Sequence, residues 1–149
     1  MTFKKFAGIL GRLCAGGLFV YAGYVKAAAP AEEFAYAIES YGIFPQEMAL
    51  FAANVLPWLE IYLGAFLISG LFSRIVSIAA VWLLAVFEIL LASAIIRKLP
   101  LANCGCFGAS AGNSIEFEIM QNLVFIVFAA VAYKYGDKML SLDLWLDKK

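Results

Sequence analysis

The sequence predicts an all-α integral membrane protein, a four-helix bundle whose N- and C-termini lie in the cytoplasm. Of the 149 residues, 64% are hydrophobic and only 15% are charged, whereas a soluble domain averages about 45–50% apolar and about 25% charged residues. One small core cannot bury this excess, so lipid must solvate much of the surface. The chain also contains four apolar runs, each long enough to cross a bilayer core about 30 Å thick.

The four runs lie close together in the chain and are expected to form one domain. They cover about 6–27, 48–70, 73–96 and 115–135. The connections between them are too short to hold a second core, so residues 1–149 are predicted to be a single transmembrane domain. Arg12 within the first run and Pro30 after it argue against reading that run as a cleaved signal peptide.

Two segments outside the spans have helical periodicity. In the connection 28–47, Phe34, Ile38 and Tyr41 recur at helical spacing, which predicts a short amphipathic helix lying on the membrane surface. The C-terminal tail, 137–149, forms a second amphipathic segment, with apolar residues on one face and acidic residues on the other. Interfacial anchoring is the simplest interpretation of both segments.

The distribution of basic residues predicts the orientation, because cytoplasmic loops are rich in Lys and Arg. With the N-terminus inside, the cytoplasmic side holds Lys4, Lys5, Arg12, Arg74, Lys134, Lys138, Lys148 and Lys149, and the outer side holds Lys26, Arg97 and Lys98. The connection 28–47 and the loop 97–114 are therefore predicted to be extracytoplasmic. The formal net charge of +0 gives no reason to expect a nucleic-acid partner.

The external loop contains Cys104-Gly105-Cys106, which places two thiols one residue apart on the oxidising side. The pair is either a disulfide or a dithiol that cycles between two redox states. A Cys-x-Cys ring is very small, and departures from relaxed disulfide geometry make the bond easier to reduce. An inert disulfide that staples the turn is the alternative, although closing so short a loop adds little stability.

The chain has no histidine, which excludes a Ser-His-Asp or Cys-His catalytic arrangement and a histidine-rich metal centre. No metal site is expected, because two nearby thiolates cannot complete a tetrahedral ligand set. The third cysteine, Cys14, lies in the first span, far from the external pair, and is interpreted as a small buried apolar residue.

Glu60 and Glu88 fall inside the second and third spans. A charged side chain at the bilayer centre costs at least about 2.5–3.5 kcal/mol, so each carboxyl group is a candidate functional residue. Lys26 at the outer end of the first span, and Gln121 with Asn122 in the fourth, lie at similar depths. We expect these polar groups to converge beneath the cysteine loop, either as a site or as a structural Lys-Glu or Glu-amide clasp between helices.

These residues resemble the DoxX-like superfamily of four-helix membrane proteins, and within it the branch of the methylamine-utilisation protein MauE. The resemblance rests on Arg12, Gly23-Tyr24-Val25-Lys26, Tyr41-Gly42-Ile43-Phe44-Pro45, Pro57 with Glu60 and Gly64, and Cys104-Gly105-Cys106-Phe107-Gly108. It implies a redox-associated inner-membrane protein, linked in the MauE branch to an exported thioredoxin-like protein and to the maturation of a periplasmic enzyme.

The resemblance implies that Cys104 and Cys106 are the redox pair, and that Lys26, Glu60 and Asn122 are matching polar positions. Gln121 departs from the pattern, because an arginine is expected there. The combined prediction is a membrane thiol-disulfide oxidoreductase that exchanges electrons between a periplasmic thiol partner and a membrane acceptor. By analogy alone, that acceptor is a quinone; no other cofactor is predicted.

Glu60 or Glu88 would relay the protons of this reaction. The alternative function is a non-catalytic subunit or assembly factor of a larger membrane redox complex, in which the cysteine pair fixes a docking loop. Other membrane subunits would then be its partners.

Overall fold

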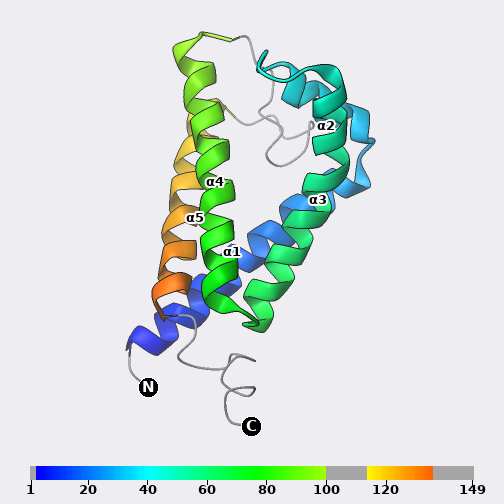
Figure 1. Cartoon of the computed structure of the whole chain (residues 1–149). Coiled ribbons are helices and arrows are strands. Elements are labelled where there is room, and N and C mark those ends of the chain that lie inside the picture. The colour runs from blue at the N-terminus through cyan, green and yellow to red at the C-terminus, as the bar shows by residue number, and fades with distance from the viewer. Residues whose placement is uncertain (1–2, 100–113, 136–149) are drawn as a thin grey trace.

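The structure, a computed structural model, describes residues 3–99 and 114–135, with side chains described from Phe6 onward. All of the regular structure in these segments is helical (Figure 1). The helices are α1 (Phe3–Ala28), α2 (Ala31–Glu39), α3 (Gln46–Ser69), α4 (Ser73–Ile96) and α5 (Ile115–Tyr135). The predicted tail 137–149 lies outside the described residues.

Four of these helices, α1, α3, α4 and α5, are long and apolar enough to cross a membrane. The predicted class, an all-helical membrane protein with four spans, is confirmed, and each predicted span coincides with one helix to within a few residues. The first turn of α1 and the last turn of α5 lie at the same end of the molecule (Figure 1). Which side of the membrane this end faces stays a prediction.

Prolines and a glycine set the helix boundaries. Pro30 and Pro45 immediately precede α2 and α3, with non-helical ψ angles of 134° and 155°. A proline also disfavours helix in the residue before it, which helps to separate α2 and α3 from the segments that precede them. Gly70 ends α3 in the left-handed conformation, with φ 71°, and its N–H donates to the carbonyl of Phe66. The turn between α3 and α4 is therefore very short, and the two helices run in opposite directions.

Helix α1 holds the bundle together, because it packs against both α3 and α5, while α5 also packs against α4. Helices α3 and α4 contact each other much less, and they diverge from their short turn toward the end that carries α2 (Figure 1). Buried apolar side chains of all four spans meet in one core, among them Ala15, Phe19, Leu67, Ala80 and Ala129.

Glycines allow the backbones of α1 and α3 to approach closely. A Cβ atom added to Gly64 would lie 2.6 Å from the carbonyl oxygen of Gly16, and one added to Gly16 would lie 2.9 Å from the carbonyl oxygen of Gly64. On another face of α1, a Cβ atom at Gly11 would lie 2.8 Å from the carbonyl oxygen of Phe128 in α5. Small residues thus form the helix contacts, as is common in membranes, where backbones approach closely for van der Waals packing.

Arg12 has a structural role at the opposite end of the molecule from α2. The side chain is only 3% exposed. Its Nε donates to the carbonyl of Leu67 at 2.9 Å, and its Nη2 donates to the carbonyl of Ile68 at 3.0 Å. These carbonyls end α3, where the helix dipole favours a positive charge, so Arg12 caps α3.

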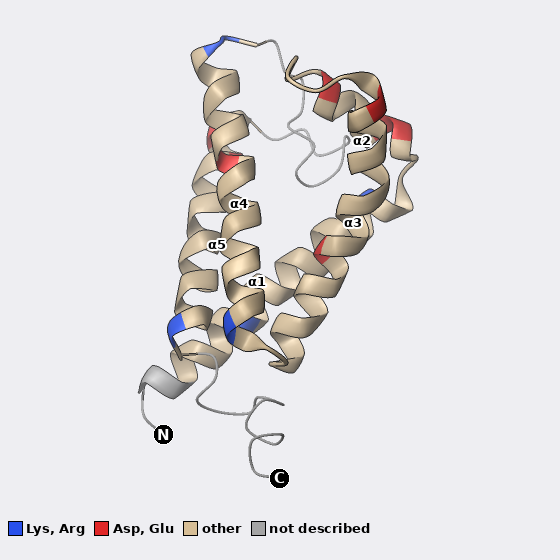
Figure 2. Cartoon of the chain, viewed as in Figure 1, with Lys and Arg blue, Asp and Glu red and all other residues tan. Residues whose placement is uncertain are grey.

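The predicted amphipathic helix in the first connection is present as α2, but its apolar side does not face the membrane. Phe34, Ala35 and Ala37 are buried and pack with Ala49 and Ala53 of α3. Tertiary packing therefore replaces the expected contact with lipid. In Figure 2, most charged residues of the helices lie toward the two ends of the molecule, with long uncharged stretches between them.

Candidate functional site

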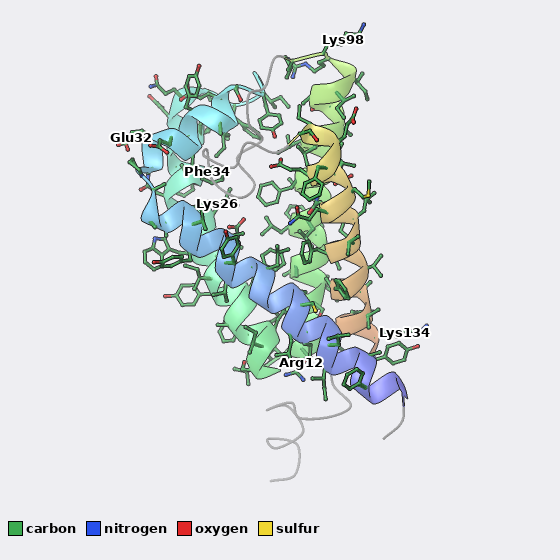
Figure 3. All side chains as sticks on the ribbon, turned by 180° about the vertical axis from the view of Figure 1, so that it is seen from behind. Arg12, Lys26, Glu32, Phe34, Lys98 and Lys134 are labelled. Carbon is green, nitrogen blue, oxygen red and sulfur yellow. The ribbon has the colours of Figure 1, made fainter. Side chains whose placement is uncertain are left out.

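A buried ion pair joins α1 to α3. The Nζ atom of Lys26 lies 2.6 Å from Oε1 of Glu60, and the two side chains are 1% and 2% exposed. The ammonium group also lies 5.0 Å from the ring centroid of Phe34 and 5.1 Å from that of Phe87, within the range of cation–π attraction. Figure 3 shows Lys26 and Phe34 on neighbouring elements at the α2 side of the bundle. Lys26 is therefore enclosed by one carboxylate and two aromatic rings.

A close helix crossing brings the two charges together. Gly23 lies one turn before Lys26, and a Cβ atom there would come within 2.5 Å of the carbonyl oxygen of Pro57 and 3.0 Å of the nitrogen of Ile61. Pro57 and Ile61 flank Glu60 in α3. Because the side chain of lysine is long, it spans the remaining turn along α1 and reaches the carboxylate.

Glu118 of α5 is a third member of this group, and the sequence interpretation missed it. Its position near the start of the fourth span suggests an external acid, but the structure leaves it only 2% exposed. Helix α5 has apolar residues on all sides, so the distribution of hydrophobic residues does not show which side faces inward. The usable signal is the spacing of Glu118 and Asn122, which places both polar side chains on one helix face.

These polar groups line a small cavity. It has a volume of about 30 Å³, enough for one ordered water molecule. One oxygen each of Glu60 and Glu118, Oε2 in both residues, is buried and has no hydrogen-bond partner among the described residues. The cavity is lined by Leu18, Phe19, Ala22, Lys26, Glu60, Leu84, Phe87, Glu118 and Asn122.

A family model described as methylamine utilisation protein MauE matches residues 4–135 of the chain. The chain belongs to this family. The expected relation to MauE is thereby confirmed, and the wider relation to the DoxX-like superfamily stays a prediction. No curated protein and no solved structure matches the chain.

The other predicted polar residues of this MauE-family protein occupy different places. Asn122 lines the cavity, and its Nδ2 donates to Oε2 of Glu88 at 2.9 Å and to the carbonyl of Leu84 at 3.0 Å. Glu88 therefore joins α4 to α5 through an amide clasp, and it does not line the cavity. Gln121 is half-buried and does not line it either.

Three tyrosines of α1 and α3 face outward. Tyr21, Tyr24 and Tyr62 are 60%, 66% and 60% exposed. Rings on the outer surface of a membrane helix are typical of contacts with the lipid interface, so we assign these tyrosines to the lipid-facing surface.

A second, larger cavity lies beside the first, where α3 and α4 diverge. It has a volume of about 380 Å³ and an almost entirely apolar lining. Phe87 lines both cavities. The lining comprises Ile38, Phe44, Glu47, Met48, Phe51, Ala52, Leu56, Leu83, Val86, Phe87 and Leu90. Since Met48 and Phe51 are more than half exposed, this cavity opens toward lipid.

The predicted redox pair, Cys104 and Cys106, lies outside the described residues. The segment that carries it, 100–113, connects the end of α4 to the start of α5. These helix ends lie on the same side of the bundle as α2 (Figure 1). Cys14 is half-buried in α1 and is a free thiol, in keeping with its interpretation as an apolar packing residue.

Proposed function

We propose that this MauE-family protein is a membrane thiol-disulfide oxidoreductase that works through Cys104 and Cys106. The observation that carries the proposal is the buried group of Lys26, Glu60 and Glu118. It lies toward the end of the bundle at which the Cys-Gly-Cys connection begins and ends. Ionisable groups inside a membrane usually mark a pathway for ions or protons, and thiol oxidation releases protons.

The thiol chemistry has two exchange steps. A thiolate of the partner attacks one sulfur of the Cys104–Cys106 disulfide, the sulfur–sulfur bond breaks, and a mixed disulfide forms. A second partner thiolate then attacks the partner's sulfur in that mixed disulfide, so the partner leaves with a new disulfide. The loop has gained two electrons and, once both thiolates are protonated, two protons.

Returning the loop to the disulfide requires a two-electron acceptor in the membrane. A lipid-soluble quinone, which takes up two electrons and two protons, is the class that the apolar cavity of about 380 Å³ suits. Its size falls in the range of about 300–1,000 Å³ that is usual for small-molecule sites. Phe87 lines both this cavity and the cavity around the charged group, and we propose that Glu60 passes the protons of the reaction.

The proposal includes a sidedness. The excess of basic residues at the end formed by the start of α1 and the end of α5 supports a cytoplasmic location for that end. The cysteine connection then faces the periplasm of a bacterial inner membrane. A thioredoxin-like periplasmic protein is the proposed partner.

Partner trapping tests the thiol chemistry. Cys104→Ser and Cys106→Ser variants are acid-quenched in membranes, and mixed disulfides are separated on non-reducing gels. One of the two variants should accumulate a mixed disulfide, and both should lose thiol-oxidising activity. Cys14→Ser is the matched control and should behave like the unmodified protein. The proposal fails if both loop variants keep full activity and trap nothing.

Labelling with a membrane-impermeant maleimide tests the sidedness. In intact spheroplasts, Cys104 and Cys106 should react only after a reductant is added, while Cys14 stays unlabelled. Labelling that requires disrupted membranes would place the connection in the cytoplasm and contradict the proposed orientation.

A second candidate function is a non-catalytic subunit or assembly factor, with the cysteine pair fixing a docking loop. The observation that favours it is that Lys26–Glu60 and Asn122–Glu88 each join two helices, as structural clasps do. Such a protein would keep its disulfide under mild reductant and would copurify with fixed amounts of membrane subunits. The redox enzyme would instead be reduced by its partner and reoxidised in the membrane.

A further inference from the structure

The buried charges around the small cavity do not balance if every acidic and basic group is ionised. Lys26 supplies one positive charge, while Glu60 and Glu118 supply two carboxyl groups, and all three side chains are at most 2% exposed. Two carboxylates would leave one uncompensated negative charge in a site otherwise walled mainly by Leu and Phe side chains. A buried group in that position neutralises itself by taking up a proton.

Lys26 is the only cation among the described residues that line this cavity. Charged groups that face Glu118 are Lys26 from α1, Glu60 from α3 and, through Asn122, Glu88 from α4. The segment 100–113 contains no Asp, Glu, Lys or Arg. A proton is therefore the charge that balances this site.

The geometry provides a place for that proton. Glu60 uses Oε1 to accept the hydrogen bond from Lys26, and its Oε2 is buried without a partner among the described residues. Oε2 of Glu118 is also buried without a hydrogen-bond partner among the described residues, and Glu118 lines the same cavity as Glu60. Two unsatisfied acceptors are costly in an apolar interior, but one proton turns one of them into a donor. One water molecule also fits in the cavity that both residues line.

We infer that Glu60 and Glu118 form a proton-binding site that holds one exchangeable proton between two carboxyl groups, opposite the Lys26 ammonium. The site carries one ammonium, one carboxylate and one carboxylic acid, so its net charge is zero. Use of this proton in thiol chemistry rests on the proposed function, whereas its presence does not. Glu118, rather than Glu88, is thus the second carboxyl group of the site.

Infrared spectroscopy of the purified full-length protein in lipid nanodiscs tests this inference, because a protonated carboxyl group has its own C=O stretching band. At neutral pH the protein should show the band of one buried carboxylic acid, and the band should shift in D₂O. Charge balance predicts the effect of each variant. Glu118→Gln and Glu60→Gln should each remove the band, because the remaining carboxylate pairs with Lys26.

Removing the positive charge should increase the carboxylic acid band instead of removing it. Lys26→Met removes the positive charge, so both carboxyl groups should be protonated and the band area should double. Glu116→Gln, which changes an exposed carboxylate on the same helix, should leave the band unchanged. Absence of the band at neutral pH, or a band that survives both Glu60→Gln and Glu118→Gln, would overturn the inference.

The same measurement separates this inference from the proposed function. Cys104→Ser and Cys106→Ser should keep the carboxylic acid band at full area, whatever they do to thiol exchange. If the band follows charge balance while both serine variants remain fully active, the proton-binding site stands and the oxidoreductase proposal fails. If the serine variants lose thiol exchange as expected and no carboxylic acid band is found, the oxidoreductase proposal stands and the proton-binding site fails.

Discussion

Replacing Lys26 with Met should destabilise the protein strongly, because it leaves a buried carboxylate without its partner. The Nζ atom of Lys26 lies 2.6 Å from Oε1 of Glu60, and the two side chains are 1% and 2% exposed. The ion pair is therefore a buried one, unlike surface ion pairs, which contribute about 0–1 kcal/mol to stability. Removing one partner of a buried pair costs about 3–5 kcal/mol. We expect about 3 kcal/mol here, the lower end of that range, because a carboxyl group can take up a proton.

A double-mutant cycle makes the test specific. Replacing both Lys26 and Glu60 by Met removes the charges together, and a buried pair replaced by apolar residues is often neutral or stabilising. The double variant should therefore recover most of the free energy of unfolding that Lys26→Met loses. Lys98→Met is the matched control, because Lys98 is exposed at the end of α4, and it should change stability by less than about 0.5 kcal/mol.

The assay is reversible unfolding of the purified protein in mixed micelles, followed by the helical circular dichroism signal as the share of denaturing detergent rises. Two results would refute the reasoning. One is a Lys26→Met variant as stable as Lys98→Met, and the other is additivity of the two substitutions in the cycle. Either result would mean that the ion pair does not form as described.

Three further predictions concern helix contacts, all measured by the same unfolding assay. Gly64→Ala places a Cβ atom 2.6 Å from the facing backbone oxygen of α1, and the free energy of unfolding should fall by about 1–3 kcal/mol. Gly17→Ala is the control: a Cβ atom there has nothing within 4 Å, so the better helix propensity of alanine should raise stability by about 1 kcal/mol. Arg12→Met removes both charged hydrogen bonds to the end of α3 and should cost about 1.5–3 kcal/mol. Asn122→Leu leaves Glu88 without its amide partner and should cost about 1–3 kcal/mol. For Gly64→Ala, Arg12→Met and Asn122→Leu, a loss below about 0.5 kcal/mol contradicts the assigned contact.

The sequence was sufficient to predict the spans, because membrane helices are defined mainly by length and hydropathy, and those are local properties. It also indicated that Lys26 and Glu60 lie at compatible depths, and the structure joins them directly. Depth alone does not determine rotation about the helix axis. For that reason the outward position of Tyr24 could not be read from the sequence, and the inward position of Glu118 is indicated there only by its spacing from Asn122.

Contacts between distant segments account for the remaining differences. The hydrophobic face of α2 has the same appearance in sequence whether it meets lipid or α3, and only the fold shows that Phe34 packs against α3. Glu88 was expected in the site because of its depth, but its carboxylate is engaged by Asn122 outside the cavity. The sequence pattern of one helix does not specify which neighbouring helix its apolar face packs against, or which residue forms a hydrogen bond with its polar side chain.

The order of the chain has a consequence for biogenesis. Helix α1 carries Arg12 and Lys26, and the groups that satisfy them, the end of α3 and Glu60, are synthesised later. The nascent first helix therefore enters the membrane before the end of α3 and Glu60 are available to its two cations, each costly in hydrocarbon. Stable insertion of α1 thus depends on the arrival of α3, so the two helices are expected to leave the insertion machinery as a unit.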